Sequence, residues 1–355
     1  VMVLSMGIGG AAFATVISQY VSGVGITIYV LKTRRDLYPE RSQLHFNKNI
    51  LKEIANLSCL TCLQQSVMNF GILMVQGLVN SFGTTIMAAF AAAVKIDTFA
   101  YLPVQDFGNA YSTFVAQNYG AGNKDRIRKG TKAAFIMSIS FSIVISLLVW
   151  IFAKLLMHIF ISKKEVMVIA AGIKYLRIVC FSYIFSSITI VYLNIMRTLE
   201  KVIISTVVYS VSLIINVIFN YILIFGISFI PSFGIAGAAI STLIARIVEV
   251  IITLVYAYRC NETVKIKLKY LIKSDKLLLK DFFRFSIPVT VNELLWGLGT
   301  SVNAAILGQL GSQVAAASSI VQVTRQLATV VAFGVSAAAA IIIGKSIGEN
   351  DIEKA

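Results

Sequence analysis

The chain has 355 residues, of which 57% are hydrophobic and 13% are charged, and its mean hydropathy is +0.83. A soluble domain carries roughly 25% charged residues, so this composition excludes a soluble globular protein. The net charge of +15 does not indicate a nucleic-acid partner. The basic residues lie between apolar runs, whereas nucleic-acid binding would gather them on one soluble face.

Apolar runs long enough to cross a bilayer follow one another along the whole chain. They predict an all-α polytopic membrane protein with about nine transmembrane helices. In chain order these cover residues 3–31, 54–81, 84–119, 131–160, 166–196, 202–227, 234–258, 284–308 and 314–344.

Basic residues gather in alternate connections between these spans. The first connection (residues 32–52), the third (120–132) and the seventh (259–284) hold most of the 31 Lys and Arg residues. The second, sixth and eighth connections hold no charge. Because basic loops are retained on the cytoplasmic side, the odd connections are predicted to be cytoplasmic, in a protein that crosses the cell membrane many times.

An internal repeat divides the chain. The glycine- and alanine-rich run at residues 7–17 recurs at 234–244, and Gly120 corresponds to Gly348 at nearly the same offset. One repeat unit therefore contains six spans. An even number of crossings returns the chain to the side on which it started, so the two copies share an orientation, as in transporters built from two parallel lobes.

The segments at residues 80–91, 95–103 and 116–122 resemble the seventh and eighth helices of the multidrug and toxic compound extrusion (MATE) family. The stretch from Arg197 to Thr242 resembles its fourth to sixth helices. The resemblance implies two six-helix lobes around a central cavity, and export of small organic cations driven by inward flow of Na⁺ or H⁺. It implies a monomer with a coupling ion and no other cofactor.

The order of these motifs indicates that the chain does not begin at the first helix of a lobe. We expect residues 1–32 to be a leftover transmembrane helix of a preceding lobe, and residues 50–260 to form one complete six-helix lobe. Residues 278–355 would be the first two helices of a second lobe. On this interpretation the chain is a fragment or a join of two related sequences.

Glu293 is the first candidate for ion coupling. It follows Pro288 within an apolar run, where an ionisable group costs several kcal/mol unless it is paired or hydrated. A carboxyl group at such depth can exchange a proton or Na⁺ for a cationic drug. The resemblance places it at the seventh-helix glutamate of the family's cation site. The alternative is a structural carboxyl that is hydrogen-bonded within the bundle.

Asn216 and Asn220 stand four residues apart and so share a helical face, and Thr242 is predicted at similar depth. The resemblance places these three residues at the first-lobe cation site of the family. That site normally includes an aspartate at the position that Val75 occupies here. Hydrogen bonding between helices is therefore the alternative role for this group.

Asp97 is predicted either to take part in cation coupling or to pair with a group on a neighbouring helix. Lys95 is two residues away and does not share its helical face. Arg246 and Glu249 stand three residues apart and are predicted to neutralise each other.

The polar residues predicted to face a substrate cavity come from several spans, and some correspond through the repeat. Gln64 and Gln65 align with Asn292 and Glu293, and Asn303 aligns with Val75. The cavity residues are predicted to be Gln64, Gln65, Asn292, Asn303 and Asp106.

The sequence holds none of the motifs of metalloproteases or serine hydrolases, so neither an enzyme nor a metal site is predicted. The leading interpretation is a cation-coupled exporter of amphipathic organic cations. The alternative is a flippase for lipid-linked saccharides of the same two-lobed architecture. A flippase should line its cavity with several arginines, which bind phosphate.

Overall fold

The computed structural model describes residues 6–33, 47–81, 83–161, 164–227, 231–259 and 312–351, together with a few helical residues between 288 and 306. Long α-helices make up nearly all of this part of the chain. They are α1 (Gly7–Thr33), α2 (Lys48–Asn80), α3 (Thr84–Gly120), α4 (Lys124–Phe160), α5 (Val166–Val179), α6 (Ser182–Thr198), α7 (Val202–Phe225), α8 (Ile235–Arg259) and α10 (Ser312–Gly348).

Seven of the described helices are long and apolar enough to cross a membrane, or eight if α5 and α6 count as one broken span. The prediction of an all-helical, multi-pass membrane protein is thereby confirmed. Most of the span predicted at residues 284–308, including Glu293, lies outside the described residues.

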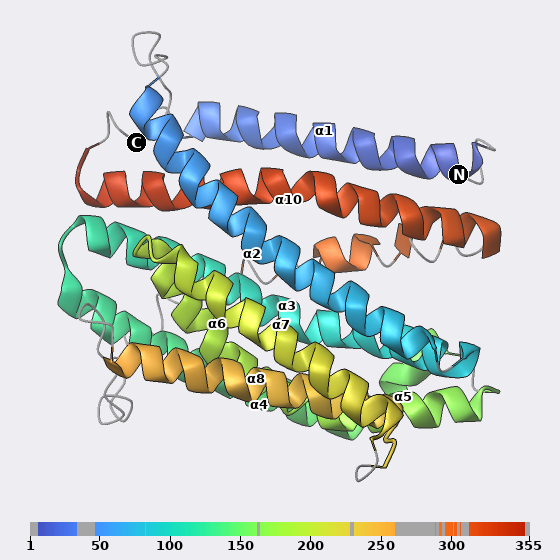
Figure 1. Ribbon diagram of the computed structural model, residues 1–355. Helices are drawn as coiled ribbons and strands as arrows, with labels where there is room; N and C mark the ends of the chain where they lie inside the picture. The colour runs from blue at the N-terminus through green and yellow to red at the C-terminus, as the bar shows by residue number, and fades with distance from the viewer. Residues whose placement is uncertain are drawn as a thin grey trace.

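The helices run roughly along one direction (Figure 1). Helices α3 to α8 form one bundle, in which α8 packs against α5, α6 and α7. Helix α10 packs on α2 and α3, and α1 lies beyond it at the edge of the molecule in Figure 1. The bundle therefore supplies most of the buried interior, whereas the apolar window of α1 has no buried residue.

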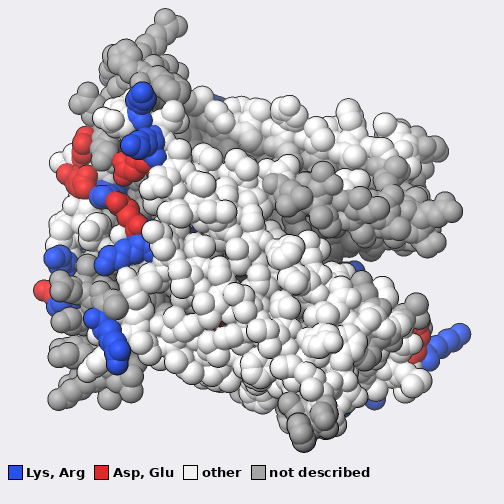
Figure 2. All heavy atoms as spheres, viewed as in Figure 1, with Lys and Arg blue, Asp and Glu red and all other residues white. Residues whose placement is uncertain are grey.

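Charged side chains gather at one end of the molecule, and the middle of the visible face is almost free of them (Figure 2). The charged end is where α2 begins and where the α3–α4 connection and the end of α10 lie (Figure 1). Large apolar side chains such as Leu147, Leu155 and Ile214 are more than half exposed along the helices. An apolar belt with the basic connections at one end is the surface that a bilayer requires.

The predicted span 166–196 is not one straight helix. Helices α5 and α6 are bent by 47° relative to each other across Cys180 and Phe181. A break of this kind frees backbone carbonyl groups, which must be satisfied inside a membrane protein. The hydroxyl group of Ser146 on α4 donates a hydrogen bond to the carbonyl oxygen of Cys180 at 2.7 Å. The bend places the buried residues Tyr175 and Tyr183 on either side of the break.

Small side chains let the helices of the bundle approach one another closely. Ala89 and Ala93 of α3 are fully buried in a core cluster that also contains Leu176 of α5 and Ala239 of α8. Close packing at small residues is the usual basis of helix association in membranes, where lipid tails are as apolar as the side chains. This packing leaves α3, α5 and α8 near enough for their polar side chains to meet.

Candidate functional site

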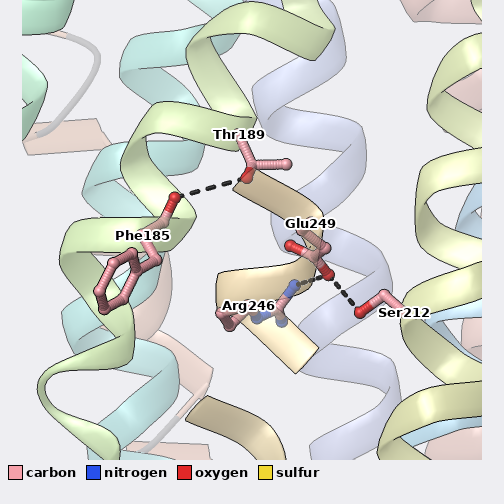
Figure 3. Close-up of polar contacts among 5 residues, drawn as sticks. All are labelled: Phe185, Thr189, Ser212, Arg246 and Glu249. Atoms are coloured by element: carbon pink, nitrogen blue, oxygen red, sulfur yellow. Dashed lines mark hydrogen bonds and ion pairs between the residues drawn. The ribbon is translucent and has the colours of Figure 1, made fainter. Parts of the chain in front are cut away.

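An ion pair lies inside the bundle on α8. The carboxylate of Glu249, which is 1% exposed, accepts hydrogen bonds from Nη1 of Arg246 at 2.7 Å and from the hydroxyl group of Ser212 on α7 at 2.6 Å. Figure 3 shows this carboxylate between Ser212 of α7 and Thr189 of α6. Glu249 is about 20 Å along α8 from its first residue, a depth near the middle of a bilayer. The predicted pairing of Arg246 with Glu249 is confirmed.

Asp97 lies near the same arginine. Its carboxyl group lies within electrostatic range of Arg246 and of Tyr183 on α6. Tyr101 follows Asp97 by one turn of α3, and the guanidinium carbon of Arg246 lies 5.8 Å from the centre of its ring. Arg246 therefore stands on the face of α3 that carries Asp97. No ion pair between Asp97 and Arg246 is among the contacts of the described residues, so the pairing of Asp97 with a neighbouring helix stays a prediction. Asp97 itself is half-buried.

A second polar group lies on α7 and α8 towards the uncharged end. The side-chain amide of Asn220, which is fully buried, donates to Oδ1 of Asn216 at 2.9 Å and to its backbone carbonyl at 2.8 Å. The two asparagines share a face, as predicted. These bonds stay within one helix, whereas the alternative interpretation expected bonds between helices. Thr242 interacts with the hydroxyl group of Tyr175 on α5.

The arrangement therefore joins five helices around a set of buried oxygen atoms. Among its charged members, Asp97 and Glu249 are acids and Arg246 is a base, so the set holds one acid more than it holds bases. An unpaired carboxylate is costly at this depth unless a proton or another cation neutralises it. Hydroxyl and amide oxygens such as those of Thr242 and Asn220 are suitable ligands for a hard cation.

The residues predicted for the substrate cavity lie elsewhere. Gln64 on α2 is 2% exposed and accepts a hydrogen bond from Arg197 of α6 at 3.4 Å, and Gln65 beside it is half-buried. Asn292 is exposed and Asn303 is half-buried. The side chain of Asp106 and the whole of Glu293 lie outside the described residues. The structure does not bring Gln64 into the cluster around Arg246.

Sequence reasoning missed the tyrosines. Tyr101 and Tyr175 interact electrostatically with Asp97 and Arg246, and Tyr183 does so with Asp97. Tyr209 of α7 interacts electrostatically with Arg246 and Glu249. A usable signal existed for one of them, because Tyr101 stands four residues after Asp97 and shares its helical face. The other three come from different helices, and their convergence could not be read from spacing.

A bundle of membrane-length helices with an apolar belt defines a multi-pass membrane protein. The MatE family model matches residues 59–222 of the chain. This part of the chain, slightly less than half of its length, is similar to the MATE family, which is a family of transporters.

Several bacterial proteins are similar to this chain. "Probable multidrug resistance protein YpnP" of Bacillus subtilis (strain 168) is 29% identical over 197 residues, which are 56% of this chain and 43% of that protein. "Probable multidrug resistance protein NorM" of Rhizobium meliloti (strain 1021) is 25% identical over 276 residues, which are 78% of this chain and 58% of that protein. The chain thus spans about half the length of these relatives.

Solved structures share the fold. A transporter of the MOP superfamily from Pyrococcus furiosus superposes with a TM-score of 0.76 at 20% identity. The match covers 85% of this chain and 66% of that chain. A structure described as the outward-facing conformation of a multidrug resistance MATE family transporter gives the same TM-score at 21% identity, with the same coverage. These likenesses support the helical architecture described above.

Proposed function

We propose that the protein acts in multidrug efflux, as a secondary antiporter that exports amphipathic organic cations in exchange for Na⁺ or H⁺. The names of the similar proteins support the efflux part of this proposal. One observation in the structure supports the coupling part: the buried set of Asp97, Arg246 and Glu249 holds one acid in excess of its base. A cation bound there would remove the cost of the excess charge.

Coupling by this lobe would involve the two polar groups together. Asp97 supplies the charge, and Asn216, Asn220 and Thr242 supply neutral oxygens nearer the uncharged end of the bundle. Glu293 remains the proposed coupling acid of the next lobe. Gln64, Gln65, Asn292, Asn303 and Asp106 remain the proposed contacts of the substrate. The proposed setting is the cell membrane, with the protein as a monomer.

The test is the accumulation of ethidium, a fluorescent amphipathic cation, in efflux-deficient bacterial cells that express the protein. We expect lower accumulation than in cells with an empty vector. Ionophores are then used to collapse the Na⁺ gradient and the H⁺ gradient separately, and we expect one of the two to abolish the difference. The ionophore that abolishes efflux identifies the coupling ion. Asp97→Asn should reduce efflux at least tenfold, because it removes the excess negative charge.

Asp125→Asn is the matched control, since Asp125 is an exposed carboxylate near the charged end whose partner is Arg128. It should leave efflux unchanged. Accumulation equal to that of the vector control under all gradients would contradict the exporter proposal. If radiolabelled lipid-linked saccharide then crossed the membrane in vesicles that contain the protein, the flippase alternative would replace it.

A further inference from the structure

We propose that Arg246 is shared between Asp97 and Glu249 as a switching counter-ion, and that the three side chains together hold one exchangeable proton. The sequence suggested that Arg246 and Glu249 form a closed structural pair. The carboxyl group of Asp97 lies within electrostatic range of the same guanidinium group, which stands over the ring of Tyr101 on α3. The inference rests on the proposed cation coupling, and it assigns the exchanging role to three residues on two helices, Asp97 on α3 and Arg246 and Glu249 on α8.

The position of Arg246 makes sharing geometrically feasible. Its Nη1 atom is bonded to Oε1 of Glu249 on the next turn of α8. Its guanidinium carbon stands 5.8 Å from the ring centre of Tyr101, on the face of α3 that carries Asp97. The side chain is 24% exposed, so it is not locked in a closed core. A planar guanidinium group has five N–H donors, and a single bond to Glu249 leaves others for Asp97.

Glu249 has an oxygen atom that the pair does not use. Its Oε1 atom accepts hydrogen bonds from both Arg246 and Ser212, whereas its Oε2 atom has no hydrogen-bond partner among the described residues. Figure 3 shows this second oxygen on the side of the carboxylate that is turned towards α6, where Thr189 lies. The hydroxyl group of Thr189 donates to the carbonyl of Phe185 at 3.4 Å, so its oxygen can accept a bond. A proton on Oε2 would therefore lie on the side of the carboxylate that faces α6.

Charge counting connects these observations. One guanidinium group neutralises one carboxylate, so the other acid of the set is neutral when it holds a proton. In the arrangement described here Arg246 is bonded to Glu249, and the proton belongs on Asp97. If Arg246 moves to Asp97, that carboxyl group loses its proton and Glu249 gains one on Oε2. The set keeps one proton and zero net charge throughout, and the position of Arg246 decides which acid carries the proton.

The remaining groups that face the set cannot replace Arg246. The titratable side chains that interact with Asp97 or Glu249 are Tyr101 on α3, Tyr175 on α5, Tyr183 on α6 and Tyr209 on α7. All are phenols, which are neutral at physiological pH. Among the described residues no second base is recorded near either acid. The half-buried Asp97 is the member that can exchange its proton with water, because Glu249 is 1% exposed.

Infrared spectroscopy of the purified protein in lipid vesicles tests this directly, because the carbonyl stretch of a protonated carboxyl group is distinct from that of a carboxylate. At neutral pH we expect a band from one protonated carboxyl group that is lost in Asp97→Asn. The same band should also be lost in Glu249→Gln, because Arg246 then pairs with Asp97 and ionises it. In Arg246→Gln the band should double. Asp125→Asn is the control and should leave the spectrum unchanged.

A closed structural pair predicts a different result. If Arg246 and Glu249 neutralise each other independently of Asp97, Glu249→Gln leaves the Asp97 band in place, and that outcome would overturn the proposal. The two acid variants are nearly isosteric with the native residues, and elution as a single species in size-exclusion chromatography verifies their folding. The spectra require no transport, so a failure here is distinguishable from a failure of the efflux assay.

Discussion

Gly120 at the end of α3 and Gly348 at the end of α10 lie in the same helix crossing. A Cβ atom on Gly120 would collide with the backbone carbonyl of Lys345, and a Cβ atom on Gly348 would collide with that of Gln117. The two glycines are the pair that corresponds through the internal repeat. Equivalent positions of the two repeat units therefore meet, at the charged end of the molecule (Figures 1 and 2).

Replacing either glycine by alanine should destabilise this crossing. Because the obstructing atoms belong to the backbone, the helices must separate, and overpacking of this kind costs about 1–3 kcal/mol. Thermal unfolding of Gly120→Ala and Gly348→Ala in detergent, followed by size-exclusion chromatography, measures the loss. Gly77→Ala is the control, since a Cβ atom there meets nothing within 4 Å. Equal melting temperatures for all three variants would argue against the close approach of α3 and α10.

A hydroxyl group of α4 bonds the backbone at the bend between α5 and α6. Ser146→Ala removes this donor to the carbonyl of Cys180 and should cost about 0.5–1.5 kcal/mol, because that oxygen keeps only the longer bond from the backbone N–H of Tyr183 at 3.3 Å. Ser142 stands one turn away on α4, is fully buried, and its hydroxyl has no hydrogen-bond partner in the described ranges. Ser142→Ala should therefore be nearly neutral in the same unfolding assay. A larger loss at Ser142 than at Ser146 would refute this account of the bend.

The helices and the ion pair were accessible to prediction because their determinants are local. Hydropathy gave the spans, and the three-residue spacing of Arg246 and Glu249 gave their pairing. The break at Cys180 was missed, since the apolar run continues through it without a proline or glycine. The bond that its carbonyl accepts from the hydroxyl group of Ser146 is a tertiary contact with another helix, which the local sequence does not show.

The environment of Asp97 was missed for a related reason. Its neighbours Tyr183 and Arg246 come from α6 and α8, which are far from α3 in sequence. The pattern around Asp97 shows that it needs a partner, but only the packing of small residues such as Ala93 determines which helix supplies it. Sequence patterns thus identified Asp97 as an ionisable group that is costly inside the membrane. The fold identified the polar side chains that lie near it.

The membrane orientation can be tested by cysteine labelling. The connections with many basic residues are predicted to be cytoplasmic. Lys129 near the start of α4 and Glu165 before α5 are both exposed, and they lie at opposite ends of the bundle. In a variant without native cysteines, a membrane-impermeant maleimide applied to intact cells should label Glu165→Cys and not Lys129→Cys. Permeabilised cells should show both labels, and the opposite pattern in intact cells would invert the topology.

The asparagine pair on α7 makes a prediction about stability at the uncharged end. The amide of Asn220 is fully buried and donates to two acceptors of Asn216. Asn220→Ala removes both donors and leaves the Oδ1 atom of Asn216 without this bond, which should cost about 1–3 kcal/mol of stability. The control is Asn56→Ala, because Asn56 is exposed near the start of α2. Unfolding temperatures in detergent compare the two variants, and if the Asn220 variant unfolds at the same temperature as the control, the pair has no structural role.

The same assay tests cation binding when it is repeated with and without Na⁺ and at different pH. If the Asn220 variant loses Na⁺-dependent or H⁺-dependent stabilisation that the control keeps, then Asn220 contributes to a cation site as well as to the helix.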